Sequence, residues 1–238
     1  MAKNRSSGVT NKQGNLKKWR ETIQEAKTND ELSEFLKKEF SIQTGLAFDK
    51  LDLDAAKLYV DSFADMVNEF PGLEDQIVRF GNTEKNAYAS MSSNGHLSLN
   101  PDELKSLEAA RKTYARDVKS GFHPAGTDVQ HIITHELGHA LEAMILKKTY
   151  QPGTPEFSNA WRECTVASEI VTAAANKAVS GYDKNPSKLR DAIIGISRYA
   201  AHDSSETMAE AVSDYRANGS KAKPLSRAIW AEIKNRLS

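Results

Sequence analysis

The chain has 238 residues, a length that fits one large domain, and its 32 basic and 32 acidic residues leave a formal net charge of zero, which gives no support for binding to nucleic acid. A single cysteine excludes an internal disulfide framework and indicates a reducing compartment such as the cytoplasm. The longest apolar run is too short for a membrane span and the N-terminus lacks the apolar core of a secretory signal, so we expect no membrane partner.

The N-terminal residues are basic and rich in small polar side chains. Acidic residues are absent from residues 1–20, whose basic residues are Lys3, Arg5, Lys12, Lys17, Lys18 and Arg20. We expect a flexible basic tail over residues 1–30, either solvated or docked on an acidic partner, and one folded domain over residues 31–238. Short helices are expected over residues 16–27, at the end of this tail, and over residues 30–40.

An amphipathic helix and a small sheet are expected next. The apolar spacing of residues 54–70 predicts a helix, which a Pro-Gly pair ends. Residues 76–80 are apolar enough for a strand. Residues 87–91 and 96–99 flank a Ser-Asn-Gly turn, which is typical of a hairpin.

We expect the rest of the chain to be helical. The predicted helices cover residues 102–119, 127–147, 156–179, 187–201, 204–217 and 224–236, and segments that contain proline or glycine separate several of them. The order of helices, a small sheet and then many helices predicts an α+β fold in which helices dominate.

The segment His135-Glu136-Leu137-Gly138-His139 carries the strongest chemical signal. Two histidines four residues apart on a helix lie about 40° apart around its axis, so both can reach one metal ion. The glutamate after the first histidine can take a proton from a water on the ion, and the pattern marks zinc-dependent peptidases. Thr127 and Gln130 have the spacing of a capping box that would start this helix. Gly138 costs about 1 kcal/mol inside a helix, so we expect the sheet or a ligand-bearing helix to approach closely there.

A catalytic zinc ion takes three protein ligands and leaves one position open. The third ligand must lie downstream or elsewhere in the fold, and no histidine follows at the spacing of the extended zinc motif. The carboxylate candidates, among which spacing alone does not choose, are Glu163, Glu169, Glu206, Glu210, Asp203 and Asp214. The other histidines with weak signals, in predicted loops or at edges, are His96, His123 and His202.

A segment downstream of the motif helix resembles part of a known family. It places Glu206 seven residues after Tyr199 and has Ala-Glu-Ala at residues 209–211. This pattern is similar to the second motif of the anthrax-lethal-factor-like zinc metalloproteases, which have relatives among the Pro-Pro endopeptidases and among phage-encoded minor head proteins. The family's first motif is a His-Glu-x-Gly-His helix followed by an acid three residues on, and this chain has Gly138 and Glu142 at those places.

The resemblance implies a zincin-like metalloprotease domain with a small sheet and an active-site helix, and one Zn²⁺ ion held by His135, His139 and Glu206. Glu210 would accept a hydrogen bond from a ligand histidine and so orient it. Tyr199 would donate a hydrogen bond to the oxyanion that forms in the reaction.

The implied mechanism makes Glu136 the general base. Glu136 would take a proton from the zinc-activated water that attacks the scissile carbonyl, and would pass it to the leaving amine. The strand at residues 96–99 resembles the edge strand that pairs with an extended substrate in this class of protease. The expected function is zinc-dependent endopeptidase activity on a protein or peptide substrate.

Other readings stay open. A virion-associated protein of the minor head or maturation type also fits the phage-like resemblance, the basic tail and the missing secretory signal. Its zinc domain would be structural, or would be a pseudo-enzyme that binds phage particle components. Glu206 could instead be the capping-box partner of Asp203, Glu210 a solvated side chain, and Tyr199 a core tyrosine. We expect His131 to be a structural, partly exposed histidine.

Overall fold

Helices form most of the computed structural model, which describes residues 12–238, and four short strands of this range form one sheet. This confirms the α+β class, with helices dominant, that the sequence predicts. The helices are α1 (Lys12–Glu25), α2 (Asn29–Phe40), α3 (Leu53–Glu69), α4 (Pro101–Leu104), α5 (Leu107–Lys119), α6 (His131–Thr149), α7 (Pro155–Arg162), α8 (Thr165–Ala178), α9 (Ser187–Ile194), α10 (Ser204–Asn218) and α11 (Pro224–Leu237). The strands are β1 (Gln43–Thr44), β2 (Arg79–Thr83), β3 (Ala89–Met91) and β4 (His96–Leu99), and a short 3-10 turn, η3 (Tyr199–Ala201), precedes α10.

Helix α1 occupies much of the segment that the sequence assigns to a flexible tail. Ile23 is fully buried, and Leu16 and Trp19 pack against the core. The ring centroids of Trp19 and Phe40 lie 4.8 Å apart, in an edge-to-face arrangement. The tail assignment is therefore wrong for residues 12–30, because these apolar side chains give the segment a face that packs on α3; residues 1–11 lie outside the described residues.

Three predicted helices are interrupted. The helix expected over residues 102–119 is divided into α4 and α5, because Ser106 caps α5 by accepting a hydrogen bond from the backbone at its third residue. The helix expected over residues 156–179 is divided between α7 and α8 at Cys164, whose φ of 51° is left-handed. The helix expected over residues 187–201 becomes α9 and η3.

The motif helix begins later than expected. The hydroxyl of Thr127 donates to the carbonyl of Pro124 at 2.7 Å, and the side chain of Gln130 caps nothing in the described part of the chain. The capping box is therefore wrong, and α6 starts at His131. The residues before it, 120–130, form a loop that leads from α5 to the motif helix.

The sheet has the strand order β1-β2-β4-β3. Strands β1, β2 and β4 are parallel, and β3 runs antiparallel to β4 in the predicted hairpin, whose turn holds Gly95 at φ 85°. The expectation that residues 96–99 form the edge strand is wrong. Strand β4 pairs with β2 on one side and with β3 on the other, so the edge strands of this sheet are β1 and β3.

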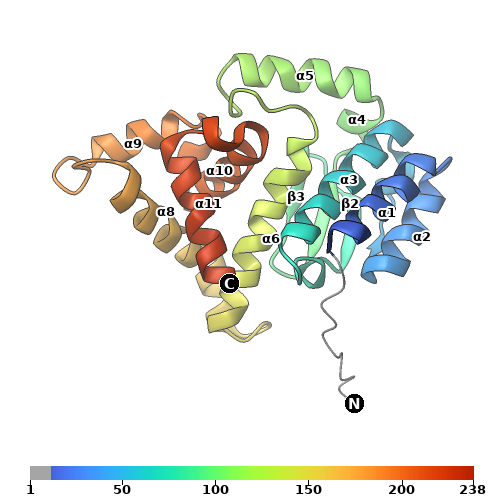
Figure 1. Cartoon of the computed structure of the whole chain (residues 1–238), viewed down its shortest axis with the longest axis horizontal. Helices are drawn as coiled ribbons and strands as arrows, with labels where there is room; N and C mark the ends of the chain where they lie inside the picture. The colour runs from blue at the N-terminus through green and yellow to red at the C-terminus, as the bar shows by residue number, and fades with distance from the viewer. Residues whose placement is uncertain (1–11) are drawn as a thin grey trace.

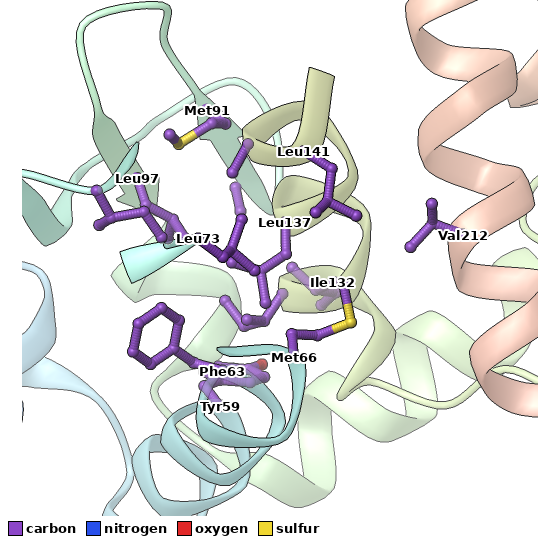
Figure 2. Close-up of a cluster of buried hydrophobic side chains, with 14 of the residues drawn as sticks. Tyr59, Phe63, Met66, Leu73, Met91, Leu97, Ile132, Leu137, Leu141 and Val212 are labelled. Atoms are coloured by element: carbon purple, nitrogen blue, oxygen red, sulfur yellow. The ribbon is translucent and has the colours of Figure 1, made fainter. Parts of the chain in front are cut away.

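Helix α6 lies between two layers (Figure 1). The sheet and α3 pack on one side of it, and α8, α10 and α11 pack on the other. Figure 2 shows side chains of α3 (Phe63 and Met66), β4 (Leu97) and α6 (Leu137 and Leu141) in one buried hydrophobic cluster. Nearly all of α6 is buried, as expected for a helix that has neighbours on every side.

Helices α6 and α10 approach each other closely at Gly138. A Cβ atom at this position would lie 2.8 Å from the Cα atom of Ala209 on α10, so only glycine allows this packing. The expected close neighbour of Gly138 is thus confirmed, and it is the helix that carries Glu206. The two halves of the chain are also joined by ion pairs from Arg216 of α10 to Asp65 and Glu69 of α3.

The described helices can be compared with the length and apolar character of a membrane-spanning helix. Within residues 12–238, no helix combines the length and the apolar character that crossing a membrane requires.

Candidate metal centre

Helix α6 places the motif side chains inside the protein. His135 and His139 lie one turn apart and are each 8% exposed, and Glu136 is 6% exposed. The Nε2 atoms of the two histidines lie 3.2 Å apart, as expected for side chains on one face of a helix. The two imidazoles therefore face a common point.

Helix α10 brings Glu206 to the same point. Asp203 caps this helix by accepting a hydrogen bond from the backbone N of Glu206 at 2.9 Å, which fixes the first turn. The side chain of Glu206 faces α6 instead of the cap. Its Oε2 lies 3.0 Å from Nε2 of His135 and 3.6 Å from Nε2 of His139. The capping-box role that the sequence left open is not the one that this carboxylate adopts.

The separations of these three atoms fit a metal ion. Two ligand atoms about 2.05 Å from a shared ion at the tetrahedral angle lie about 3.3 Å apart. The observed separations of 3.0, 3.2 and 3.6 Å bracket that value. Two imidazoles and one carboxylate are also ligand types that zinc takes in catalytic sites. The group His135, His139 and Glu206 could therefore hold a metal ion.

Hydrogen-bond acceptors fix both imidazoles. His135 Nδ1 donates to Glu210 Oε1 at 2.9 Å, and His139 Nδ1 donates to Ser205 Oγ at 2.9 Å. Ser205 Oγ in turn donates to Glu142 Oε2, which is 2.5 Å away. Because an ionised carboxylate only accepts, these bonds place the proton of each neutral ring on Nδ1 and leave the Nε2 lone pair facing the site. Three lone pairs then converge, and a cation or a proton is needed to stabilise them.

The charges of the site favour a cation. Burial alone would lower the pKa of His135, but hydrogen bonds with Glu206 and Glu210 raise this pKa well above its usual value. Burial would raise the pKa of Glu210, yet hydrogen bonds from His123 and His135 lower it to about 2. The pKa of Glu206 is far below its ordinary range, because the neighbouring His135 and His139 favour its ionised form by more than its burial opposes it. Two ionised carboxylates therefore lie in a buried site.

Two further polar groups lie beside the ligand atoms. Glu136 Oε2 is buried and has no hydrogen-bond partner among residues 12–238. Burial raises the pKa of Glu136, and the imidazoles of His135 and His139 offset only part of this, so its carboxylate is a stronger base than usual. The Tyr199 hydroxyl donates to Glu206 Oε1 at 3.3 Å. Burial raises the pKa of Tyr199 as well, so the hydroxyl keeps its proton and stays a donor.

A cavity of about 420 Å³ opens beside this centre. Its size falls in the range of about 300–1,000 Å³ that is common for small-ligand sites. His135, Glu136 and Tyr199 contribute to its wall, together with α5, the loop of residues 120–130 and the segment that leads into β3. Its apolar and aromatic lining residues include Ala87, Tyr88, Ala89, Tyr114, Phe122 and Ile132.

Strand β3 has a free backbone edge beside the cavity. Backbone hydrogen bonds join Tyr88 and Ser92, which flank this strand, to the β4 side of the hairpin. In an antiparallel pair the residues that bond to the neighbouring strand alternate with those that do not. Ala89 and Met91 therefore direct their N–H and C=O groups away from β4, where another extended chain could pair with them.

The remaining carboxylate candidates lie elsewhere. Glu169 of α8 pairs with Arg236 at 2.8 Å. Asp214 accepts a hydrogen bond from Asn218 at 2.8 Å. Glu163 follows the end of α7 and is exposed. Of the candidate carboxylates in the described chain, only Glu206 has an oxygen close to the Nε2 atoms of both motif histidines, whereas Glu210 bonds to the Nδ1 atom of His135.

Several polar residues around the site differ from what the sequence predicts. Glu210 is 1% exposed and not solvated. His131 is 4% exposed, because its Nδ1 accepts a hydrogen bond from Asp128 N at 2.8 Å and its ring lines the cavity. His123, whose sequence signal is weak, is buried with Nδ1 3.2 Å from Glu210 Oε1. Ser205 has no motif to mark it, since its contacts arise only when α6 and α10 pack together.

These residues define a class of site: a centre of two imidazoles and one carboxylate, with a buried glutamate and a tyrosine hydroxyl beside the ligand atoms. Comparison of the chain with protein-family models, with curated proteins and with solved structures gave no match. The chemistry of the centre is therefore derived from the residues themselves.

Proposed function

We propose that this protein is a zinc-dependent endopeptidase of the zincin type, similar to the anthrax-lethal-factor-like proteases and the Pro-Pro endopeptidases. The observation that carries the proposal is the convergence of the His135, His139 and Glu206 ligand atoms, with Glu136 and Tyr199 beside them. Zinc is favoured over magnesium or calcium, because imidazole nitrogen suits zinc whereas the harder cations prefer oxygen ligands. When bound, the ion would supply Lewis acidity toward water and toward the scissile carbonyl.

Glu136 is suited to move the proton in this reaction. Its buried Oε2, which no described residue hydrogen-bonds, is free to accept a proton from the attacking water. Burial raises the pKa of Glu136, which makes its carboxylate a stronger base, and the same group could deliver the proton to the leaving nitrogen. Proton transfer by a positioned group of this kind contributes about 10²- to 10⁴-fold to the rate.

Tyr199 is suited to stabilise charge on the substrate. Its protonated hydroxyl lies at the ligand carboxylate and would turn to the oxygen of the scissile carbonyl as negative charge develops there. A single donor in such a place contributes about 3 kcal/mol to the transition state. His135 and His139 need not reorganise, because Glu210 and Ser205 already hold their rings.

The proposed substrate is a protein or peptide in extended form. The outward N–H and C=O groups of Ala89 and Met91 can pair with its backbone, which is a recurring mode of peptide recognition. A side chain next to the scissile bond would then enter the cavity that His135, Glu136 and Tyr199 border.

Catalysis is favoured over a partner-binding pseudo-enzyme. Glu136 is not needed to bind the metal, and burial of its unpartnered carboxylate costs free energy that a structural zinc site does not require. Association with phage particles, with the zinc domain structural or in maturation, stays a prediction of the sequence resemblance.

The experiment that tests this function separates metal binding from proton transfer. Glu136→Gln replaces the carboxylate by an amide of the same shape, so we expect stoichiometric zinc in elemental analysis but a loss of peptide-library cleavage of about 10²- to 10⁴-fold. Glu156→Gln, on the exposed surface of α7, is the matched control and should cleave like the wild type. Equal cleavage by Glu136→Gln and wild type would refute the mechanism, and wild-type protein without zinc would refute the centre.

A further inference from the structure

His123 is buried beside the metal centre but has no part in the proposed reaction. It lies in the loop between α5 and α6 and is 9% exposed. Its ring stacks on Tyr114, with 4.8 Å between the ring centroids and 11° between the planes. Its Nδ1 lies 3.2 Å from Glu210 Oε1, whereas its Nε2 is buried without a hydrogen-bond partner in the part of the chain that the structure describes. Among the described residues, the hydrogen bond of this ring is therefore the one to Glu210.

Glu210 is the carboxylate that holds the ligand His135. Its Oε1 accepts from His135 Nδ1 at 2.9 Å and from His123 Nδ1 at 3.2 Å. Its Oε2 is buried and finds no hydrogen-bond partner among the described residues. With His135 alone, this carboxylate could rotate about a single hydrogen bond. A second donor on the same oxygen, from a different segment of the chain, fixes its position.

The loop that carries His123 is itself anchored. Two backbone hydrogen bonds, of 2.8 and 3.2 Å, join residues 121–122 to residues 198–199, which precede α10. Asn218 Nδ2, at the end of α10, donates to the carbonyl of Ala125 at 2.8 Å. The loop is thus bonded near both ends of the helix that carries Glu210, and it presents His123 from a fixed backbone.

We propose that His123 is a positioning residue of the metal centre: by holding Glu210 Oε1, it fixes the ring of His135 and the direction of the Nε2 lone pair that faces the ion. This inference rests on the proposed metal centre and adds a residue to it. Groups that hydrogen-bond a ligand directly change metal affinity by about 10- to 100-fold, and His123 acts through one such group, so the lower end of this range applies. Loss of the His123 donor should therefore weaken zinc binding about tenfold.

The test compares two substitutions of His123. His123→Phe keeps an aromatic ring against Tyr114 but removes the donor, and His123→Asn loses the ring but keeps an N–H close to the place of Nδ1. Zinc affinity is measured by competition with a chromophoric chelator, and folding of the metal-free protein by circular dichroism. We expect His123→Phe to bind zinc about tenfold more weakly and His123→Asn to recover most of that loss.

The controls distinguish the inference from the proposed centre. Tyr114→Phe alters the same cavity wall but leaves the His123 donor, so its zinc affinity should equal that of the wild type. Wild-type protein that binds no zinc would overturn the centre and this role together. If wild-type protein binds zinc and a folded His123→Phe variant binds it with the same affinity, the role of His123 is overturned but the metal centre is not. If His123→Phe does not fold, His123→Gln takes its place, because the glutamine amide extends past the position of Nδ1. Equal zinc affinities of the His123→Asn and His123→Gln variants would then overturn the role.

Discussion

Replacement of Gly138 by alanine tests whether the contact between α6 and α10 sets the geometry of the metal centre. The added Cβ would lie 2.8 Å from Ala209 Cα, whereas ordinary contact begins at 3.4 Å, so α10 must move away by about 0.6 Å. Ala209 lies one turn after Glu206 on the same helix, so the movement carries Oε2 of Glu206 away from the imidazoles. Metal–ligand distances tolerate shifts of only about 0.2 Å.

The same substitution should cost little stability. Overpacking costs about 1–3 kcal/mol, and the better helix propensity of alanine returns about 1 kcal/mol. The net loss of at most about 2 kcal/mol should lower the Tm of the metal-free protein by no more than about 8 °C for a chain of this length. Zinc affinity should fall by about tenfold or more, because the ligand shift exceeds what the ion tolerates.

The assay is chelator competition for zinc affinity, with thermal unfolding of the metal-free protein measured in parallel. Adding Ala209→Gly to the same chain is the control. It removes the Cβ of Ala209, which is 3.2 Å away, but leaves the nearer Cα, so it should not restore zinc binding. A Gly138→Ala protein that binds zinc within about twofold of the wild type would refute the reasoning, because the predicted 0.6 Å movement would then leave the ligands in place.

Two further predictions concern the rest of the site. Ser205→Ala breaks the link between His139 and Glu142, so we expect about tenfold weaker zinc binding and a loss of about 1–3 kcal/mol of unfolding free energy. Chelator competition measures the zinc affinity, and urea unfolding measures the stability. An unchanged value in both assays would contradict the link. Ala89→Pro removes an N–H at the free edge, so the KM for peptides should rise with little change in Tm, whereas Ser90→Pro removes an N–H that faces β4 and should lower the Tm. An unchanged KM for Ala89→Pro would show that substrates do not pair with β3.

The local part of the centre could be predicted from the sequence. The spacing of His135 and His139 determines their relative placement once the helix is identified, and the glycine between them predicted the close neighbour that the structure confirms. The third candidate ligand, Glu206, could not be predicted from local sequence in this way. Spacing left several carboxylates open, because the approach of Glu206 depends on how α10 packs on α6, which no local pattern contains. Resemblance to a family supplied that pairing instead.

The sequence was a poor guide where tertiary contacts override local signals. A helix was expected over residues 16–27, but the basic composition of this segment favoured a flexible tail and did not show that Ile23 packs α1 on the core. The break between α7 and α8 occurs at Cys164, with no glycine or proline at that position to mark it. The family resemblance led us to expect an edge strand at β4, and the hairpin pattern could not correct this, because pairing with β2 requires a crossover that the pattern does not show. His123 has no motif, since its partner lies 87 residues away on another helix.

The ligands come from α6 and α10 alone, and the segment that joins these helices contributes none of them. Within that connection, α9 has no buried residue and residues 183–188 are all exposed. Exposed stretches of this kind tolerate insertion, because lengthening them disturbs no packed backbone. An affinity tag or a fluorescent reporter placed at residues 183–185 would therefore follow the protein in cell extracts while the candidate metal centre stays intact.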